Sequence, residues 1–310
     1  MVIQITEPKD YSGKALATYR ELGSVVLDDK PRADADILVL RLKYKIDGSW
    51  FDKMPNLKVV ATPTTGLNHV DVTEAEKRGI KVISLRGHTD FLDRITSTAE
   101  HTLGLMIALA RKLPWSFEDV KAGNWNRDAF KGNQLAEKTL GILGLGRLGK
   151  MVARYGQALG MKVVAHDPNV SAEEMAKLGV AYSPFDELFR ISDALSVHAM
   201  LTDDTKDLVK EGHLQLMKPS AVLINTARAE IIAKGALEKA LKENRIAGAA
   251  VDVMWDEAGD GSHLAQSELW KMAKEGKNVL IVPHLGGATN EAMHITEEFI
   301  ADLTKKYING

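Results

Sequence analysis

The segment from residue 139 to residue 167 decides the fold. It begins with Thr139-Leu140-Gly141-Ile142-Leu143, a short apolar run typical of a strand buried on both faces. Gly144-Leu145-Gly146-Arg147-Leu148-Gly149 follows, with the pattern G-x-G-x-x-G. Apolar residues at helical spacing predict a helix from about residue 147 to residue 159, and residues 162–165 predict a second strand. The segment ends in His166-Asp167-Pro168.

This order of elements predicts a dinucleotide site. Gly144 permits a tight turn, Gly146 lets the backbone approach a pyrophosphate, and Gly149 lets the helix pack closely on the strand. The first helical turn, which holds Arg147 and Leu148, presents unpaired N–H groups and a positive dipole end to the phosphates. Asp167 lies 21 residues past Gly146, where a carboxylate can accept both ribose hydroxyls and repel a 2′-phosphate, so we expect NAD and not NADP. The alternative is another adenosine ligand, such as a methyl-donor cofactor.

Composition is that of a globular protein with two domains. The chain has 310 residues, of which 45% are hydrophobic and 26% are charged. A net charge of −2 gives no general reason to expect nucleic acid or a membrane surface as partner. The absence of cysteine excludes disulfides, cysteine–metal sites and thiol catalysis. No signal peptide or membrane-spanning run is readable, so we expect a cytoplasmic protein.

Strands and helices alternate along most of the chain, which predicts parallel sheets covered by helices. We expect a first domain at residues 1–95, completed by a last helix within residues 288–310, and a second domain at residues 96–287. The fold class is therefore α/β, with two doubly wound parallel-sheet domains: a flavodoxin-like one and a Rossmann one that holds the dinucleotide. Strands are predicted at residues 2–6, 25–27, 37–40, 59–62 and 82–84, and then at 139–143, 162–165, 180–182, 194–198, 221–225, 247–253 and 279–282.

The region between the two predicted domains is unusually apolar. A helix expected at residues 96–112 is apolar nearly all round, and Pro114, Trp115 and the turn Gly123-Asn124-Trp125 follow it. We expect this helix to be buried between domains or in a subunit interface, and we predict a homodimer formed through residues 96–125.

Polar side chains follow three strands of the second predicted domain. Asn225–Glu230 contains Arg228, Asp252–Glu257 contains Glu257, and Pro283–Thr289 contains His284. Ligands of open α/β sheets bind beyond the carboxyl ends of the strands, so we expect the arginine, the glutamate and the histidine to converge there. No spacing of histidines and acids predicts a metal site.

With these motifs, the chain resembles the D-isomer-specific 2-hydroxyacid dehydrogenase family over nearly its whole length. The glycine motif with Asp167 and the three strand-end segments carry the resemblance, together with Val197–Thr202, Ala99–Thr102 and Thr65–Asp71. Within the family, it resembles short-form 3-phosphoglycerate dehydrogenases and glyoxylate or hydroxypyruvate reductases. Met200, Ala233 and Met254 depart from the family's usual residues and leave the subfamily open.

The resemblance implies NAD-dependent interconversion of a D-2-hydroxy acid and its 2-oxo acid. Arg228 would hold the substrate carboxylate, His284 would exchange a proton with the reacting oxygen, and Glu257 would orient that histidine and favour its protonated form. The cofactor would be bound by the residues of the glycine motif with Asp167, and by His198, Thr226, Ala227, Asp252 and Gly286. His198 is expected to contribute its backbone and no chemistry.

The resemblance also places the substrate against the first domain. Amides around Thr65 and Gly66 would grip its carboxylate, and Arg41 and Lys43 would suit an anionic distal group such as a phosphate. We therefore predict a 3-phosphoglycerate-type substrate, with glyoxylate or hydroxypyruvate as the alternative. The other functions considered are a non-catalytic NADH-sensing scaffold, which the intact Arg228, Glu257 and His284 disfavour, and formate oxidation.

Overall fold

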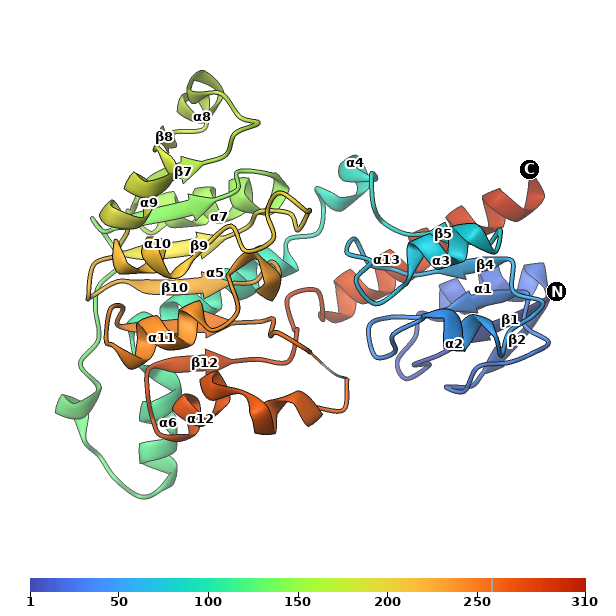
Figure 1. The fold of residues 1–310 in the computed structure, drawn as a ribbon, viewed down its shortest axis with the longest axis horizontal. Coiled ribbons are helices and arrows are strands. Elements are labelled where there is room, and N and C mark those ends of the chain that lie inside the picture. Colours follow the sequence, from blue (N-terminus) through green and yellow to red (C-terminus); the bar gives the residue numbers. More distant parts are fainter. Residues whose placement is uncertain (258) are drawn as a thin grey trace. The chain divides into compact units, whose positions relative to one another are not determined.

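The computed structural model describes residues 1–257 and 259–310 and divides them into two compact units. The first unit contains Met1–Ile95, a short stretch ending at Ser262, and Ala288–Gly310. The second contains Thr96–Glu257 and His263–Gly287. Each unit is built on its own parallel sheet (Figure 1).

The sheet of the first unit has the order β2-β1-β3-β4-β5, and every neighbouring pair is parallel. Its strands are β1 (Val2–Ile5), β2 (Ser24–Leu27), β3 (Ile37–Val39), β4 (Val59–Ala61) and β5 (Lys81–Ile83). Its helices are α1 (Gly13–Leu22), α2 (Gly48–Phe51), α3 (Val72–Lys77), α4 (Thr89–Leu92) and α13 (Asn290–Asn309).

Alternation along β3 builds a core on each side of this sheet. Ile37 and Val39 pack with residues of α1 and with Ile300 and Ala301 of α13. Leu38 packs on the opposite side with residues of α2 and α3. Helix α13 therefore completes the first unit from the far end of the chain, because its apolar face shares a core with β3 and α1.

The sheet of the second unit has the order β12-β11-β10-β9-β6-β7-β8 and is also parallel throughout. Its strands are β6 (Thr139–Leu143), β7 (Lys162–His166), β8 (Ala181–Tyr182), β9 (Ala194–Val197), β10 (Val222–Asn225), β11 (Gly248–Val251) and β12 (Val279–Ile281). Its helices are α5 (Ser97–Ala110), α6 (Leu113–Lys121), α7 (Arg147–Ala158), α8 (Ala172–Lys177), α9 (Phe185–Ile191), α10 (Glu211–Gln215), α11 (Ala236–Lys242) and α12 (Glu268–Lys274). Short 3-10 turns lie at η1 (Arg127–Phe130), η2 (Ala229–Ile231) and η3 (Ser262–Gln266).

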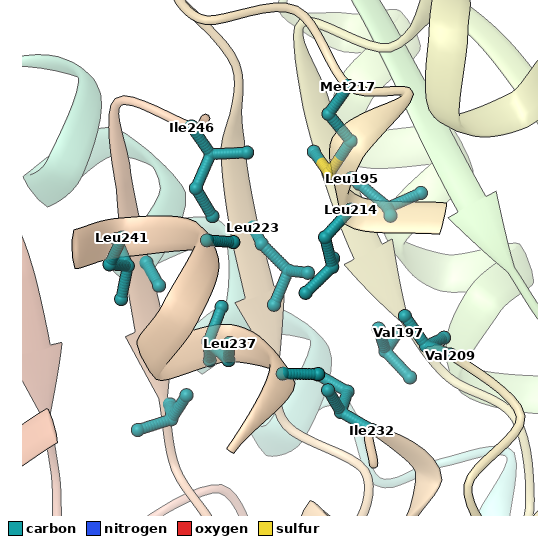
Figure 2. Packing of buried hydrophobic residues seen from close by; sticks show 14 of the residues in the cluster. Leu195, Val197, Val209, Leu214, Met217, Leu223, Ile232, Leu237, Leu241 and Ile246 are labelled. Carbon is teal, nitrogen blue, oxygen red and sulfur yellow. The ribbon is translucent and has the colours of Figure 1, made fainter. Parts of the chain in front are cut away.

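Helices cover both faces of this second sheet. On one face, Leu195, Val197 and Leu223 pack against Leu214 of α10 and Leu237 of α11 (Figure 2). On the other face, apolar residues of β6, β7 and β10 pack against α5 and α7. The predicted fold class, α/β with two doubly wound parallel sheets, is confirmed.

The prediction for the residues after α5 was incomplete. Lys112 adopts a left-handed conformation with φ of 51°, and the chain then starts a separate helix, α6, with Pro114 in its first turn. Proline is tolerated at this place because the first amides of a helix have no partner within it. None of the described helices has the length and apolar character that a membrane crossing requires.

Candidate active site

The glycine turn of the second unit lies where the strand order reverses. The chain runs from β6 to β7 and β8 on one side of β6, and then returns to β9 on the other. Gly144 follows β6 with φ of +91°, and a Cβ added there would lie 2.5 Å from the amide nitrogen of Ala199, just past β9. A Cβ on Gly149 would lie 2.2 Å from the carbonyl oxygen of Gly144. Both glycines are therefore required by the packing of the turn itself.

Gly146 differs from these two glycines. It has φ of −72°, which any residue adopts, and no atom lies within 4 Å of the position its Cβ would take. It is the N-cap of α7, and no side chain caps the helix there. The space beside Gly146 at the start of the helix is therefore open to a ligand, which fits the pyrophosphate of a dinucleotide at a helix N-terminus.

Asp167 holds the edge of the same turn. Its Oδ2 accepts a hydrogen bond from the Leu145 amide at 2.7 Å, and its Oδ1 accepts one from the Asn169 amide at 2.8 Å. Each carboxylate oxygen has two lone pairs, so both oxygens retain capacity for ribose hydroxyls. The carboxylate lies directly after β7, as a ribose-binding acid does in this fold.

His198 follows β9 and is held without a charged partner. Its Nε2 lies 2.8 Å from Oγ of Ser196, and its Nδ1 is buried with no hydrogen-bond partner among the described residues. Burial lowers the pKa of His198 to about 4. The ring is therefore neutral near pH 7, and the prediction that it contributes no proton chemistry is consistent with this environment.

The turn after β10 presents Arg228. The Asn225 side chain braces this turn by donating to the Arg228 carbonyl at 2.9 Å and accepting from the Ala227 amide at 3.0 Å. Thr226 is tied to α5 through its hydroxyl, 2.7 Å from that of Thr102. Burial lowers the pKa of the Arg228 guanidinium, while the negative charges of nearby acids oppose this effect; these acids are Glu230, Glu257 and Asp252. The bracing by Asn225 and Thr102 was not predicted from the sequence.

His284 and Glu257 form the pair that the sequence predicted. Nδ1 of His284 lies 2.9 Å from Oε1 of Glu257, and the side chains are 24% and 37% exposed. Burial raises the pKa of Glu257, but the hydrogen bond and charge of His284 lower it, with the net result below its ordinary value. His284 has φ of +54°, a strained conformation for a residue with a side chain.

Asp252, which we expected to bind cofactor, clamps the turn that carries His284. Its Oδ1 accepts from the Leu285 amide at 2.6 Å, and its Oδ2 accepts from the Gly286 amide at 2.9 Å. Nε2 of His101, from α5, lies 3.2 Å from the same Oδ1. The carboxylate is buried, so these contacts hold the left-handed turn in place. The sequence gives no local signal for the contact between His101 and Asp252.

The remaining predicted residues belong to the first unit. Thr65 and Gly66 lie in the turn after β4, which is closed by a 2.9 Å hydrogen bond from the Thr64 hydroxyl to the Gly66 carbonyl. Arg41 and Lys43 lie in the loop after β3, and each pairs with a carboxylate of its own unit. The described residues contain no group of three or more histidines and acids arranged to hold a metal ion.

Comparison with known proteins gives the family. Residues 103–286 match the family model of the D-isomer specific 2-hydroxyacid dehydrogenase, NAD binding domain. The chain is 36% identical over 284 residues to glyoxylate reductase of Thermococcus litoralis, covering 89% of this chain and 81% of that protein. It is 34% identical over 278 residues to D-3-phosphoglycerate dehydrogenase of Methanocaldococcus jannaschii, covering 89% of this chain but only 50% of that protein.

Solved structures agree with this assignment. The D-lactate dehydrogenase of Aquifex aeolicus, solved with NAD and lactic acid, superposes with a TM-score of 0.81 at 27% identity, and the match covers 100% of this chain and 96% of that one. The chain thus spans about half the length of the phosphoglycerate dehydrogenase relative and most of the length of the others. The chain belongs to the family of D-isomer specific 2-hydroxyacid dehydrogenases, and the second unit holds the NAD-binding domain of that family.

Proposed function

We propose that the protein is an NAD-dependent oxidoreductase that interconverts a D-2-hydroxy acid and its 2-oxo acid. The observation that carries this proposal is the 2.9 Å contact between His284 and Glu257. The two residues follow the carboxyl ends of β11 and β12, in the part of the chain that matches the NAD-binding domain of the family. A histidine oriented by a carboxylate is suited to proton exchange with a substrate oxygen near neutral pH.

The roles of the three catalytic residues follow from their chemistry. When Glu257 accepts a hydrogen bond from Nδ1–H of His284, the Nε2 atom of that ring is left to give a proton to the carbonyl oxygen in reduction, or to take one from the hydroxyl in oxidation. Arg228 would bind the substrate carboxylate with two parallel hydrogen bonds and polarise the neighbouring carbonyl. The bound NAD supplies the hydride acceptor or donor of the reaction.

The cofactor would be held by the second unit, which we propose as the NAD-binding domain at residues 96–287. Gly144, Gly146 and Gly149 would shape the turn for the pyrophosphate, and Asp167 would bind the ribose and disfavour NADP. The other proposed contacts are the amides of Arg147 and Leu148, with His198, Thr226, Ala227, Asp252 and Gly286.

The substrate would be held in part by residues 1–95 and 288–310, which we propose as the substrate-binding domain. The amides of Thr65 and Gly66 would bind its carboxylate, and the loop with Arg41 and Lys43 would face its distal end. The relatives include both D-3-phosphoglycerate dehydrogenases and glyoxylate reductases, so both substrate classes belong in the test.

We also propose a homodimer formed through residues 96–125. Helix α6 contributes no buried residue, Phe117 is 67% exposed, and Trp125 beyond the helix is 88% exposed. Apolar side chains this exposed on neighbouring turns are typical of a surface covered by another protein chain. Analytical ultracentrifugation tests this proposal, and a monomer at micromolar concentration would contradict it. The cytoplasmic location stays a prediction.

The activity is tested by NADH oxidation with glyoxylate, hydroxypyruvate, pyruvate, oxaloacetate and phosphohydroxypyruvate. We expect turnover with at least one of these acids, and a loss of about 100-fold or more in kcat for His284→Ala, the range of general acid catalysis. Glu257→Gln is compared with Glu243→Gln, which removes a carboxylate from an exposed ion pair on the surface. Full activity of His284→Ala would refute the proposed role, and NADH binding without any turnover would favour the scaffold function.

A further inference from the structure

The order of strands in the first unit marks where a ligand would meet that unit. The chain passes from β1 to β2 on one side and then to β3 on the other, so the order reverses between β1 and β3. In parallel α/β sheets, ligands bind beyond the carboxyl ends of the strands at such a point. The residues there are Glu7, just after β1, and Arg41 to Lys43, just after β3.

The backbone amides at this point are already occupied by the protein's own carboxylate. Oε1 of Glu7 accepts hydrogen bonds from the amides of Arg41 at 3.1 Å and Lys43 at 3.2 Å. Burial raises the pKa of Glu7, and the same two amide bonds act against that effect. Successive amides of a loop form a common binding site for phosphate oxygens. An incoming phosphate would have to displace the Glu7 carboxylate to bind the amides of Arg41 and Lys43.

The Arg41 guanidinium is also occupied. Its Nε and one terminal nitrogen donate to Oε1 of Glu297 at 2.8 and 2.5 Å, and its other terminal nitrogen donates to the Lys9 carbonyl at 3.0 Å. Glu297 comes from α13, is fully buried, and accepts a 2.8 Å hydrogen bond from the Ser12 amide. Turning Arg41 toward a ligand would leave a buried carboxylate without its counter-ion, which is strongly unfavourable.

Lys43 is held by a weaker pair at the surface. Its Nζ donates to Oδ2 of Asp29 at 2.8 Å, and the Tyr44 hydroxyl donates to the same oxygen at 2.8 Å. Asp29 also accepts from the Glu7 amide at 2.8 Å, so the loops after β1, β2 and β3 are joined. Exposed pairs of this kind contribute little stability and are readily removed by substitution.

Both cations at this point are already paired with the protein's own carboxylates. Two cations, Arg41 and Lys43, face three carboxylates, those of Glu7, Asp29 and Glu297. We propose that the substrate is a short 2-oxo acid whose only anionic group is the reacting carboxylate, and that Glu297 and Asp29 exclude substrates with a distal phosphate or second carboxylate. This inference rests on the proposed function, and it weighs against the 3-phosphoglycerate-type substrate that the cations alone favoured.

Two matched pairs of substrates test the inference on the wild-type protein. Hydroxypyruvate and phosphohydroxypyruvate differ by one phosphate, and pyruvate and oxaloacetate differ by one carboxylate. We expect kcat/KM with NADH to be at least 10-fold higher for the member of each pair that lacks the second anionic group, in each pair that is turned over. A preference for phosphohydroxypyruvate or oxaloacetate would overturn the inference while leaving the proposed dehydrogenase activity intact. Absence of turnover with every acid would refute the proposed function and this inference with it.

Variants then test whether the named carboxylates set the preference. Asp29→Asn frees Lys43 at an exposed site, where folding is expected to be kept, and Glu297→Gln frees Arg41. Each is expected to shift the ratio of kcat/KM by roughly 3- to 10-fold toward the member with the second anionic group. Adding Lys43→Met to Asp29→Asn should cancel the shift that Asp29→Asn causes. Glu21→Gln is the control, because it breaks an exposed pair with Lys305 in the same unit. An unchanged ratio in a folded Asp29→Asn protein would overturn the role of these carboxylates.

Discussion

Substituting Gly146 by alanine separates the binding role of the glycine motif from its structural role. The structure assigns the three glycines of the motif different environments. A Cβ on Gly144 or Gly149 would lie within 2.5 Å of backbone atoms, whereas a Cβ on Gly146 would meet nothing within 4 Å. We therefore expect Gly146→Ala to fold normally and to bind NADH poorly.

The expected magnitudes follow from these environments. Gly146 has a φ that alanine adopts, so the loss of chain entropy in the unfolded state stabilises by about 0.4–1 kcal/mol. Alanine is a poorer N-cap than glycine by a similar amount, roughly 0.5–1 kcal/mol, so the two effects nearly cancel. The added methyl group would hold a pyrophosphate away from the amides of the first turn. Loss of one hydrogen bond to a charged group costs about 1.5–3 kcal/mol, which weakens NADH binding roughly 10- to 100-fold.

The assay is a titration of NADH fluorescence together with urea unfolding of the same preparations. Gly149→Ala is the matched control, because its Cβ would lie 2.2 Å from the Gly144 carbonyl oxygen. Overpacking of this kind costs about 1–3 kcal/mol, so its unfolding midpoint should fall clearly below that of the wild type. Wild-type NADH affinity in Gly146→Ala, or a loss of stability as large as that of Gly149→Ala, would refute the reasoning.

Three further predictions concern the second unit. Asp252→Asn should lower kcat about 10- to 100-fold, because the side chain that clamps the His284 turn loses its charge. Asp193→Asn is the control: it removes a carboxylate that is bonded to the Thr139 amide and to Lys218, so it should lower stability but leave kcat unchanged. His198 has a pKa of about 4 when folded and 6.5 when unfolded, so the unfolded state binds more protons between these pH values. The free energy of unfolding should therefore fall by up to about 3 kcal/mol as the pH drops from 6.5 to 4. His198→Gln should remove this part of the pH dependence of stability. Asp167→Ser should lower the ratio of NADH to NADPH activity at least 10-fold, because the like charge facing a 2′-phosphate is gone; an unchanged ratio would contradict this role.

The sequence was sufficient where a local pattern has one structural solution. The apolar run at residues 139–143, the glycine spacing and the helical periodicity after Arg147 all indicate the same strand, turn and helix, and the structure has them at Thr139–Leu143 and Arg147–Ala158. Alternating strands and helices likewise allow few topologies, because crossover connections between parallel strands are almost always right-handed. Fold class and most strand positions could therefore be predicted.

Local patterns were insufficient where a backbone changes direction without glycine. Helix α6 was missed because Pro114 and Trp115 suggested the end of a helix, yet the break is made by Lys112 in a left-handed conformation. The strained φ of His284 is a second example, since no residue type in its neighbourhood requires it. That turn depends on Asp252, 33 residues earlier than the amide of Leu285 that it holds.

The charge at a site is harder to predict than its position. Arg41 and Lys43 were correctly placed after a strand, and their residue types alone favoured an anionic ligand. Glu297 follows Arg41 by 256 residues and reaches it only because α13 packs on the sheet of the first unit. A cation that is paired with a buried carboxylate does not attract an incoming anion, because leaving that partner would expose an uncompensated buried charge. In the inference proposed above, substrate preference depends on which acids the tertiary fold brings to these cations, and α13 supplies one of them, Glu297.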